Sequence, residues 1–516
     1  MSDRFKSQKV LAGFLVFLFS FILLSSGFLW AEEVTIVIVH TNDFHGRLLP
    51  FEDKKMSEKD KIGGSAYLAS LIKKIRAEYP KSVLLLDAGD IAQGTPISNI
   101  FKGLSVIDVM NHENYDVGTI GNHEFDWGQK ALLQMIKNAK FQIVTANIIE
   151  KDKNALLFGL KPYTIREVQG VKIAVIGVTT TDTPIVTKPS NVDGLEFQDP
   201  AAVVNRYYPI VKSKGAKIVI VLSHLGVDAD EALAKKVKGV DLIVGGHSHT
   251  VLKDPKIVNN VVIVQTGNNG KYLGKFVIKY DKETNKIVSY TTKGELIPVL
   301  DSKITPDAEI AKIVKKYDAQ VAPQMNVVVA EAKVDLLTPS TGGNPKVDSP
   351  LGSLVCDAMK EKAGSQITFM NAGGLRSPIY KGQIKVGDIF NLMPFDNSLV
   401  TMDLTGADVL KVLEQGTNTH GMVQVSSGTK VVYNPKAPQG SRIIEATVDG
   451  KPVDPNGVYR VTTIDFIASG GDGFNSFKNG KNLVYGDLLR DVLLNYFKAH
   501  SPIEIPAPGR IEVSEK

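Results

Sequence analysis

Short apolar runs rich in β-branched residues recur through the first half of the chain, and amphipathic segments lie between them. Runs of this length that end at polar residues or glycine are typical of buried strands, whereas residues 63–79 and 127–139 have helical spacing. This alternation predicts an α/β domain with a sheet core covered by helices. The runs are VTIVIV (34–39), SVLLLD (82–87), YDVGTI (115–120), FQIVTAN (141–147), VKIAVIGV (171–178), KIVIVLS (217–223), VDLIVGG (240–246) and VVIVQTG (261–267).

A second domain is expected after this region, because 516 residues are too many for one hydrophobic core. Residues 305–321 predict a helix, with Thr305 as its N-cap and Pro306 at the first helical position. We expect it to connect the first domain to a mixed α/β region that contains a hairpin turn at Asp449-Gly450 and a last helix over 487–500. The predicted boundaries are 1–31 for a targeting segment, 32–300 for the first domain, 301–324 for the connecting helix and 325–516 for the second domain.

The first residues predict a targeting segment. MSDRFKSQK is basic, and residues 10–30 are apolar apart from glycine and serine, a run long enough to span a bilayer. A cleaved signal peptide is favoured over a retained N-terminal membrane anchor. Under either interpretation residues 32–516 are exported to the periplasm, the cell surface or the medium. The last residues, PAPGRIEVSEK, carry no hydrophobic tail and therefore no sign of a lipid anchor.

The net charge and the cysteine count argue against some classes of function and of site. The formal net charge of +5, from 60 basic and 55 acidic residues, does not predict a protein that binds a nucleic-acid polymer. It leaves room for small anionic substrates. The one cysteine, Cys356, excludes an intrachain disulfide and a cysteine-based metal site, and its apolar surroundings predict a buried packing residue.

Polar side chains follow five of the predicted strands. The carboxyl ends of neighbouring strands in an α/β sheet meet at one edge, where such domains build their sites. Asp43 and His45 are two residues apart, as are His247 and His249, so on extended backbone each pair would point to one side. The polar residues at these ends are Asp43 and His45, Asp87 and Asp90, Asn122 and His123, His224, and His247 and His249.

These side chains offer carboxylate, imidazole and amide ligands without a thiolate. Such a set suits zinc, manganese, iron or cobalt, and it has too many members for one four-coordinate ion. Two ions ~3.5–4 Å apart, bridged by a carboxylate, would use them all and suit the hydrolysis of phosphate esters. Taken singly, each residue is better interpreted as part of a turn. Asp87 is expected to cap a loop, and His40 and His112 to pack or stabilise turns. Five strand ends in succession make coincidence improbable.

The motifs DFHG, GD at Asp90, GNHEFD, SHLG and GHSHT together resemble those of the calcineurin-like metallophosphoesterases. The arrangement is similar to their 5'-nucleotidase branch, which includes UDP-sugar hydrolases and ecto-5'-nucleotidases, from about residue 34 to the C-terminus. This resemblance implies a β-sandwich flanked by helices, a helical linker and a mixed α/β substrate-binding domain.

The resemblance also implies roles for individual residues. One divalent ion would be held by Asp43, His45, Asp90 and His249, and the other by Asp90, Asn122, His224 and His247, with Asp90 as the bridge. His249 is the least secure ligand, because relatives vary at this position. His123 and Asp126 would form the catalytic dyad, which leaves Glu124 of GNHEFD with a structural role. Zinc, manganese or cobalt would be the metal.

Three motifs in the second half bear on the substrate: NAGGLRSP (371–378), NLMPFDN (391–397) and FIASGGDGF (466–474). By themselves they are better interpreted as a glycine turn with a solvated arginine and as aromatic packing. The family resemblance implies that Phe395 and Phe466 stack on a nucleobase, that Asp472 binds the ribose, and that Asn371 and Arg376 hold the nucleotide. One departure is a missing arginine before SPLGSLVCDAM, where Lys346 is the nearest cation, and lysine cannot replace a bidentate guanidinium.

These observations predict an exported phosphohydrolase with two divalent metal ions that removes phosphate from nucleotides, with 5'-mononucleotides as the favoured substrates. The alternatives within the family are hydrolysis of UDP-sugars or of 2',3'-cyclic nucleotides, and hydrolysis of sulfur-substituted carriers is less favoured because the base-stacking motifs are present. A surface protein that binds nucleotide or metal without catalysis is the alternative from another class. The expected partner is a nucleotide or nucleotide-derived small molecule.

Overall fold

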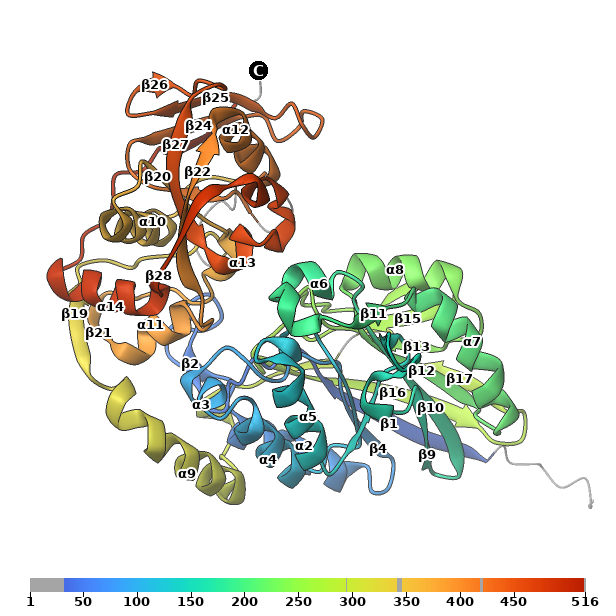
Figure 1. The fold of residues 1–516 in the computed structure, drawn as a ribbon. Coiled ribbons are helices and arrows are strands. Elements are labelled where there is room, and N and C mark those ends of the chain that lie inside the picture. Colours follow the sequence, from blue (N-terminus) through green and yellow to red (C-terminus); the bar gives the residue numbers. More distant parts are fainter. Residues whose placement is uncertain (1–31, 294, 341–345, 418–420, 515–516) are drawn as a thin grey trace, which may run out of the picture.

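The computed structural model describes residues 32–514 except 294, 341–345 and 418–420, so the predicted targeting segment lies outside the described residues. Two domains, each with its own sheets, are joined through helix α9 (Ala308–Met325), which leads from one to the other in Figure 1. Among the described residues, no helix is both long enough and apolar enough to cross a membrane.

The first domain contains two large sheets, as the apolar runs predict. One has seven strands, in the order β17 (Lys286–Tyr290), β16 (Tyr272–Asp281), β1 (Glu33–Thr41), β4 (Val83–Asp87), β5 (Val117–Thr119) and β6 (Gln142–Val144), with β18 (Glu295–Pro298) also pairing with β16. The other has six strands, in the order β14 (Lys256–Val258), β15 (Val261–Val264), β13 (Leu242–Val244), β12 (Ile218–His224), β10 (Val171–Thr179) and β9 (Tyr163–Val168).

The two sheets pack face to face, and this follows from the two-residue period of their strands. In β1, Ile36 and Ile38 lie in the core between the sheets, whereas Val37 and Val39 pack under helices on the outer face. Strands β4, β5, β12 and β13 all run parallel to a neighbour, so their carboxyl ends lie at one edge of the sandwich.

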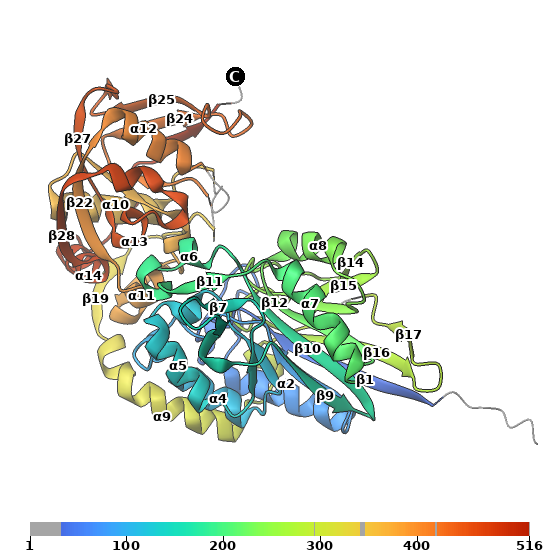
Figure 2. The ribbon, with the colours of Figure 1, turned by 45° about the vertical axis from the view of Figure 1, so that its right-hand side comes forward.

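Helices cover both outer faces of the sandwich (Figure 2). Those on the seven-stranded sheet are α2 (Ser65–Glu78), α4 (Leu104–His112) and α5 (Gly128–Asn138); those on the six-stranded sheet are α7 (Pro200–Ser213) and α8 (Val227–Lys236). Shorter elements are α3 (Pro96–Asn99), α6 (Thr183–Val186), β2 (Phe51–Glu52), β3 (Lys61–Ile62), β7 (Ile148–Glu150), β8 (Ala155–Leu156) and β11 (Leu195–Phe197). The predicted α/β class and the sandwich that the resemblance implies are both confirmed.

Helix α9 differs from its prediction at the N-terminus. It begins at Ala308, and its N-cap is Asp307, whose side chain accepts a hydrogen bond from the Ile310 amide at 3.0 Å. The assignments of Thr305 as N-cap and of Pro306 as the first helical residue were therefore wrong, because the carboxylate of Asp307 is the better-placed acceptor. The buried Ile310 and Val314 pack α9 against the first domain, and its far end meets α11 (Val386–Leu392) of the second domain.

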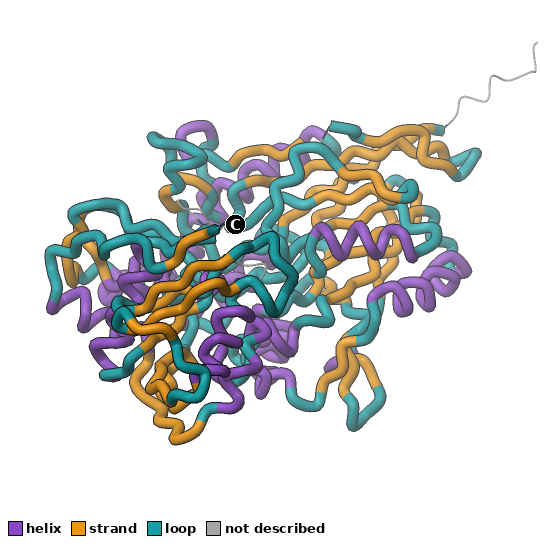
Figure 3. The backbone as a smooth tube through the Cα atoms, turned by 90° about the horizontal axis from the view of Figure 1, so that it is seen from above, coloured by secondary structure: helices purple, strands orange, loops and turns teal. Residues whose placement is uncertain are grey.

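The second domain forms a separate group of strands when it is seen from above (Figure 3). Its five-stranded sheet has the order β23 (Gln424–Val425), β20 (Ile367–Met370), β27 (Val458–Ile464), β22 (Ser398–Thr405) and β28 (Lys481–Leu488); its four-stranded sheet has the order β26 (Lys451–Pro452), β25 (Ile443–Val448), β24 (Thr429–Tyr433) and β29 (Ile511–Val513). Strands β19 (Val328–Ala332) and β21 (Gly382–Lys385) form a pair. The predicted turn at Asp449-Gly450 joins β25 to β26.

Helices complete the core of the second domain. They are α10 (Pro350–Ala363), α11, α12 (Gly406–Gln415), α13 (Asp465–Ala468) and α14 (Leu489–Ala499). Cys356 lies on α10, fully buried in this core, and burial raises the pKa of its thiol to about 12, so it is the packing residue that the sequence predicts.

Candidate functional site

The predicted ligand residues of the first domain converge at the carboxyl edge of the sandwich. They lie in the loops that follow β1, β4 and β5, at the end of β12, and in the loop after β13. Asp43, His45, Asp90, Asn122 and His224 are all buried. The structure thus brings together polar groups from five places in the chain, and it arranges them in two clusters.

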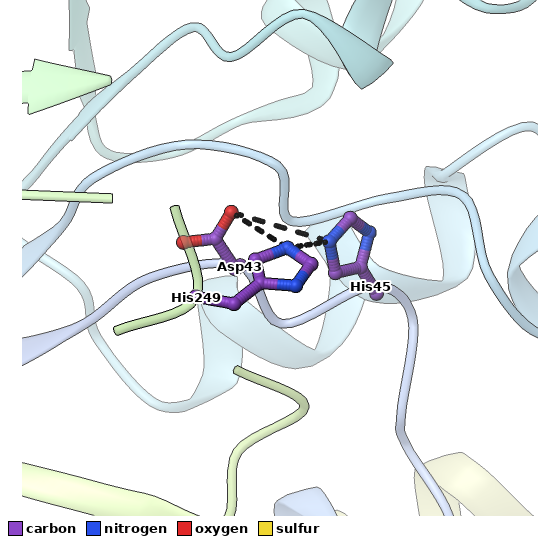
Figure 4. Close-up of side chains that lie close together, drawn as sticks. All are labelled: Asp43, His45 and His249. Carbon is purple, nitrogen blue, oxygen red and sulfur yellow. Dashed lines mark hydrogen bonds and ion pairs between the residues drawn. The ribbon is translucent and has the colours of Figure 1, made fainter. Parts of the chain in front are cut away.

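The first cluster consists of Asp43, His45 and His249, and their side chains point toward one another in Figure 4. The His249 Nε2 atom lies 3.0 Å from His45 Nε2 and 3.3 Å from Asp43 Oδ1. His249 is the most open member, with its side chain 29% exposed, and Asn268 Nδ2 lies 3.0 Å from its other ring nitrogen.

The second cluster consists of Asp90, His224 and His247, with Asn122 beside it. The His224 Nε2 atom lies 3.1 Å from Asp90 Oδ2 and 3.2 Å from Asn122 Oδ1. The other ring nitrogen of His224, Nδ1, lies 2.7 Å from the Ala88 carbonyl oxygen, which accepts a hydrogen bond from it. This hydrogen bond orients the ring so that Nε2 faces Asp90.

The ligand loops have an unusual backbone that the sequence pattern did not predict. Asp43, His45, Asp90, His247 and His249 all have positive φ values, between 49° and 74°. Non-glycine residues pay an energetic cost of about 1–3 kcal/mol for such conformations, which cluster at functional sites. The expectation that each Asp-x-His or His-x-His pair lies on extended backbone was therefore wrong.

The consequence is clearest for the two histidines after β13. His247 belongs to the second cluster and His249 to the first, so the pair does not point to one side. The turn between them separates the imidazoles and lets one loop serve both clusters.

The carboxylates of the two clusters favour positive charge beside them. Burial lowers the pKa of His224, but the carboxylates of Asp90 and Asp43 outweigh burial and raise it to about 10. Burial and the charge of His224 lower the pKa of His247 to about 3, so its imidazole is neutral and can act as a ligand. The donors are oxygen and nitrogen with no thiolate, and within each cluster the donor atoms of three residues lie within 4.8 Å of one another. The residues of the two clusters fit divalent metal ions that prefer oxygen and nitrogen ligands.

His123 and Asp126 form a hydrogen-bonded pair beside the clusters. The 3₁₀ turn η1 (His123–Phe125) brings His123 Nδ1 to 2.7 Å from Asp126 Oδ2. Burial lowers the pKa of His123, but Asp126 and Asp90 outweigh it, so the pKa lies above its ordinary value. The His123 ring also lies 5.3 Å from the His45 ring between centroids.

The sequence analysis missed Thr187, which contacts this pair. The Thr187 hydroxyl donates to Asp126 Oδ1 at 3.0 Å, so both carboxylate oxygens of Asp126 are engaged. Asn191 also donates its side-chain amide to the Asp126 carbonyl at 2.9 Å. No motif marks Thr187, because it lies 61 residues away in a short segment after α6.

The remaining polar residues near the strand ends have structural roles. Glu124 accepts hydrogen bonds from the amides of Gly121, Asp90, Ile91 and Ala92, and so holds the loop that carries Asp90. Asp87 accepts from the Thr41 hydroxyl and the Gly89 amide, as a loop-capping residue does. His40 is buried against Gly274, and His112 lies with its Nδ1 atom 2.8 Å from the Asp108 carbonyl oxygen.

Two residues of the second domain reach the clusters. The Arg376 Nη2 atom lies 3.4 Å from His45 Nε2. The Phe395 ring lies 5.8 Å from the His123 ring between centroids and 5.9 Å from the Arg376 guanidinium carbon. Asn99 of α3 donates to the Pro394 carbonyl, which fixes the loop that carries Phe395 against the first domain.

The other predicted substrate residues lie together on the second domain. The Asn371 side-chain amide donates to Asp472 at 2.7 Å. Phe466 on α13 lies against Gly471, where an added Cβ would meet its ring at 2.5 Å. The neighbouring 3₁₀ turn η6 (Gly471–Gly473) packs against α6 of the first domain. The segment TGGNPKVDSPLG includes residues 341–345, outside the described part of the chain, and the Lys346 carbonyl accepts a hydrogen bond from the Tyr433 hydroxyl at 2.8 Å.

Comparison with known proteins gives matches over both domains. The calcineurin-like phosphoesterase model matches residues 36–251, and the model of the 5'-nucleotidase C-terminal domain matches residues 328–479. A snake venom 5'-nucleotidase from Crotalus adamanteus is 31% identical over 93% of this chain and 89% of its own length. Endonuclease YhcR of Bacillus subtilis is also 31% identical over 94% of this chain. The match covers 41% of the length of YhcR.

A solved structure agrees with both matches. The 5'-nucleotidase precursor from Thermus thermophilus superposes with a TM-score of 0.87 and 34% identity, over 94% of this chain and 100% of that one. The phosphoesterase match and the two donor clusters together identify a metal-dependent hydrolase of phosphoric esters. The resemblance that the motifs predicted is confirmed, and the chain belongs to the 5'-nucleotidase family.

Proposed function

We propose that this protein is an exported phosphohydrolase that removes phosphate from 5'-mononucleotides. The observation that carries the proposal is the position of the His123–Asp126 pair. The His123 ring lies beside His45 of the first cluster and Phe395 of the second domain, and its backbone amide donates to Asp90 of the second cluster at 2.9 Å. A possible proton donor, groups that can bind cations and an aromatic ring that can stack on a nucleobase thus lie side by side. The names of the relatives, 5'-nucleotidases from snake venom and from Thermus thermophilus, support this substrate class and export.

The two clusters would hold two divalent ions. Asp43, His45 and His249 would bind one, His224, His247 and Asn122 the other, and Asp90 would bridge them. When bound, such a pair supplies Lewis acidity toward phosphoryl oxygens. Glu124 contributes indirectly, because its hydrogen bonds to the amides of Asp90 and Ile91 fix the bridging carboxylate.

His123 would stabilise the negative charge that develops as the ester bond breaks. Its Nδ1 proton is held by Asp126, which orients the ring and keeps Nε2 directed away from the pair. The raised pKa of His123 favours the imidazolium, which is the form that stabilises an oxyanion or protonates a leaving alkoxide.

The second domain would bind the rest of the nucleotide. Arg376, beside His45, offers a guanidinium fork to the phosphate. Phe395 and Phe466 would stack on the base, and Asp472, oriented by Asn371, would accept hydrogen bonds from the ribose hydroxyls. These assignments come from the family motifs, and the contacts of Arg376 and Asn371 support them.

The test uses residues 32–516, stripped with chelator and resupplied with manganese, zinc, cobalt or magnesium. Phosphate release is followed from AMP, UMP, ADP and UDP-glucose, and from 2',3'-cyclic AMP with added phosphatase. We expect AMP and UMP to be hydrolysed fastest, and His123→Ala to lower kcat by about 10²–10⁴-fold. The matched control is His112→Ala, on the surface of α4, which should keep full activity. If two ions bind but no ester is hydrolysed, the protein is a binding protein and the proposal is wrong.

A further inference from the structure

The loop that carries Phe395 is held by polar contacts along its whole length, although its ring is only half-buried. This loop, residues 393–397, connects α11 to β22. Each of its residues contacts a side chain from another part of the chain. The partners are Arg490 for Met393, Phe395 and Asp396, Asn99 for Pro394, and Asp465 for Asn397. The backbone beneath the Phe395 ring is therefore tied to the rest of the protein at several points.

Arg490 makes three of these contacts. It is the second residue of α14, and it is only 8% exposed. Its Nη1 atom lies 3.3 Å from the carbonyl oxygen of Met393 and 3.5 Å from that of Phe395, and its Nη2 atom lies 2.5 Å from Asp396 Oδ1. Its guanidinium carbon lies 3.9 Å from the centre of the Phe390 ring on α11, and α14 packs against α11 (Figure 1). One buried side chain thus connects both helices to the loop.

The position of the Phe395 ring depends on the backbone that Arg490 contacts. A phenylalanine side chain has two torsion angles and few staggered rotamers, so a fixed backbone leaves its ring few positions. Stacking on another ring requires a particular spacing and offset. A ring that is half-buried is held only in part by its own packing, and contacts to its backbone supply the rest.

Arg510 is a second buried arginine of the same domain, with similar contacts in another place. It is 9% exposed and donates to both carboxylate oxygens of Asp357, at 2.9 and 2.6 Å. It also donates to the carbonyl oxygens of Ser353 and Val425, each at 3.1 Å. These partners belong to α10 and β23, and none of them is a candidate substrate residue. The loss of either arginine should therefore destabilise the domain, but Arg490 is the one of the two that contacts the Phe395 loop.

We propose that Arg490 is a positioning residue for nucleobase binding, because its guanidinium holds loop 393–397 so that the Phe395 ring is in place to stack on the base. This inference rests on the proposed function, and it adds a residue that lies outside the three substrate motifs. Without the guanidinium, the loop gains conformational freedom that it must lose again when the base binds. The affinity for the base should then fall, whereas the chemistry at the phosphate should not change.

The experiment compares Arg490→Gln with the matched control Arg510→Gln on AMP and on ribose 5-phosphate, which has no base. We expect Arg490→Gln to raise KM for AMP by about 3–10-fold, less than the ~5–100-fold for loss of a whole base-aromatic stack. Its kcat for AMP and its KM for ribose 5-phosphate should not change. Arg510→Gln should lower the melting temperature by a similar amount and leave both KM values unchanged. Equal rises for the two esters, or the same rise in both variants, would mean that Arg490 only supports the fold.

Milder variants keep the test open if Arg490→Gln folds poorly. Arg490→Lys keeps the charge beside Asp396 and loses the guanidinium fork, so its KM for AMP should lie between those of the parent and Arg490→Gln. Asp396→Asn removes the ion pair at a side chain that is 66% exposed, and it should raise KM for AMP by about 2-fold. No change of KM in any of these variants would overturn the proposal.

A double variant tests whether Arg490 acts through Phe395. Once Phe395→Ala has removed the ring, the position of its backbone no longer matters for stacking. Arg490→Gln should therefore raise KM for AMP no further in that background. The same rise with and without the ring would show that Arg490 does not act through Phe395.

Binding without turnover separates this inference from the proposed function. Calorimetry measures the binding of adenosine and of inorganic phosphate to the metal-loaded protein, after metal content and melting temperature have shown that each variant is folded. Arg490→Gln should weaken adenosine binding by about 3–10-fold and leave phosphate binding unchanged. Equal adenosine affinities in the parent and the variant would contradict the role of Arg490. Failure of the parent to hydrolyse any ester would instead contradict the proposed function, and adenosine binding would still decide the role of Arg490.

Discussion

The two domains differ in how far the fold already orders their candidate site residues. In the first domain, the polar residues are buried and hydrogen-bonded to one another, as in His224 with Asp90 and His123 with Asp126. In the second, Phe395, Phe466 and Asp472 are only partly buried and lie on three separate segments, namely a loop, helix α13 and the turn η6. The first domain is thus organised for reaction in the absence of substrate, whereas the second presents surfaces that a substrate must bring together.

This difference separates two kinds of expected defect. Changes in the buried network of the first domain should lower kcat for every ester, because the network acts on the phosphate that all substrates share. Changes in the second domain should raise KM for nucleotides and spare esters that lack a base. Single substitutions in each domain can test this division.

The carboxylate that we propose as the bridge between the two ions should have the largest effect. Asp90→Asn removes this charge, and we expect activity to fall by at least about 10³-fold, because a bound metal pair would supply several kcal/mol to the reaction. Bound metal, measured by elemental analysis, should fall with it. Asp87→Asn is the control: it lies three residues away, but burial raises the pKa of Asp87 to about 8, so the natural side chain is already neutral at pH 7. Equal losses in the two variants would contradict the assignment of Asp90.

Removal of the stacking ring should affect only nucleotides. We expect Phe466→Ala to raise KM for AMP by about 5–100-fold, the range for loss of one base-aromatic stack, with kcat nearly unchanged. Hydrolysis of p-nitrophenyl phosphate, which has no base, should not change. Tyr485→Ala, which removes a ring that is 70% exposed on the same domain, should leave both substrates unaffected. A loss on both substrates would mean that Phe466 supports the fold and not the base.

The hydrogen bond from Thr187 should affect kcat alone. Thr187→Val keeps the shape of the buried side chain and removes the donor to Asp126, and we expect kcat to fall by about 10-fold with KM unchanged. Thr187→Ser should restore most of the activity. If Thr187 acts through Asp126, Thr187→Val should cost nothing further in an Asp126→Asn background, and additive losses would argue against this connection.

The last prediction concerns the dependence of stability on pH and not the activity. Burial raises the pKa of Asp230 from 3.8 to about 8, although the Ser223 hydroxyl and the charge of His224 lower it. The folded state therefore keeps a proton that the unfolded state loses, and the free energy of unfolding falls as pH rises between these two values, by roughly 1.4 kcal/mol per unit. Asp230→Asn should remove this slope and be more stable than the parent at pH 8.

Urea titrations at pH 5, 6.5 and 8 would measure how the free energy of unfolding changes with pH. In residues 32–516 the one tryptophan is Trp127, which packs against the core of the first domain, so fluorescence reports on that domain. Asp228→Asn, exposed on the same helix, should unfold with the parent's pH dependence. If the parent and Asp230→Asn have the same slope, the buried carboxyl of Asp230 does not titrate in this range.

Much of the site could be predicted from the sequence because its parts are local. A β-branched run followed by Asp, His or Asn predicts both a strand and the polar residue at its end. The sequence alone therefore predicted Asp43, Asp90, Asn122 and His224 as site residues. The His123–Asp126 pair could be predicted for the same reason, since two residues three positions apart on one short turn lie close together. Their roles as ligands and dyad stay predictions until the variants are measured.

The rest depends on contacts between distant parts of the chain. Sequence spacing could not show that His247 and His249 turn toward different clusters, because left-handed backbone at non-glycine residues has no sequence signal here. The sequence gives no sign of Thr187, because only the fold brings the residue that follows α6 to within hydrogen-bond distance of Asp126. Likewise, Asp307 and not Thr305 caps α9, because the folded turn places its carboxylate under the Ile310 amide.

Short segments of the sequence are enough to show which chemical groups this protein has and in which order its strands carry them, since strand periodicity and ligand type are properties of short segments. Only the folded chain shows how those groups divide into two clusters and which polar neighbours, such as Thr187 and Glu124, hold them. The physical reason is that burial and charge are properties of the whole fold, and no short segment contains them.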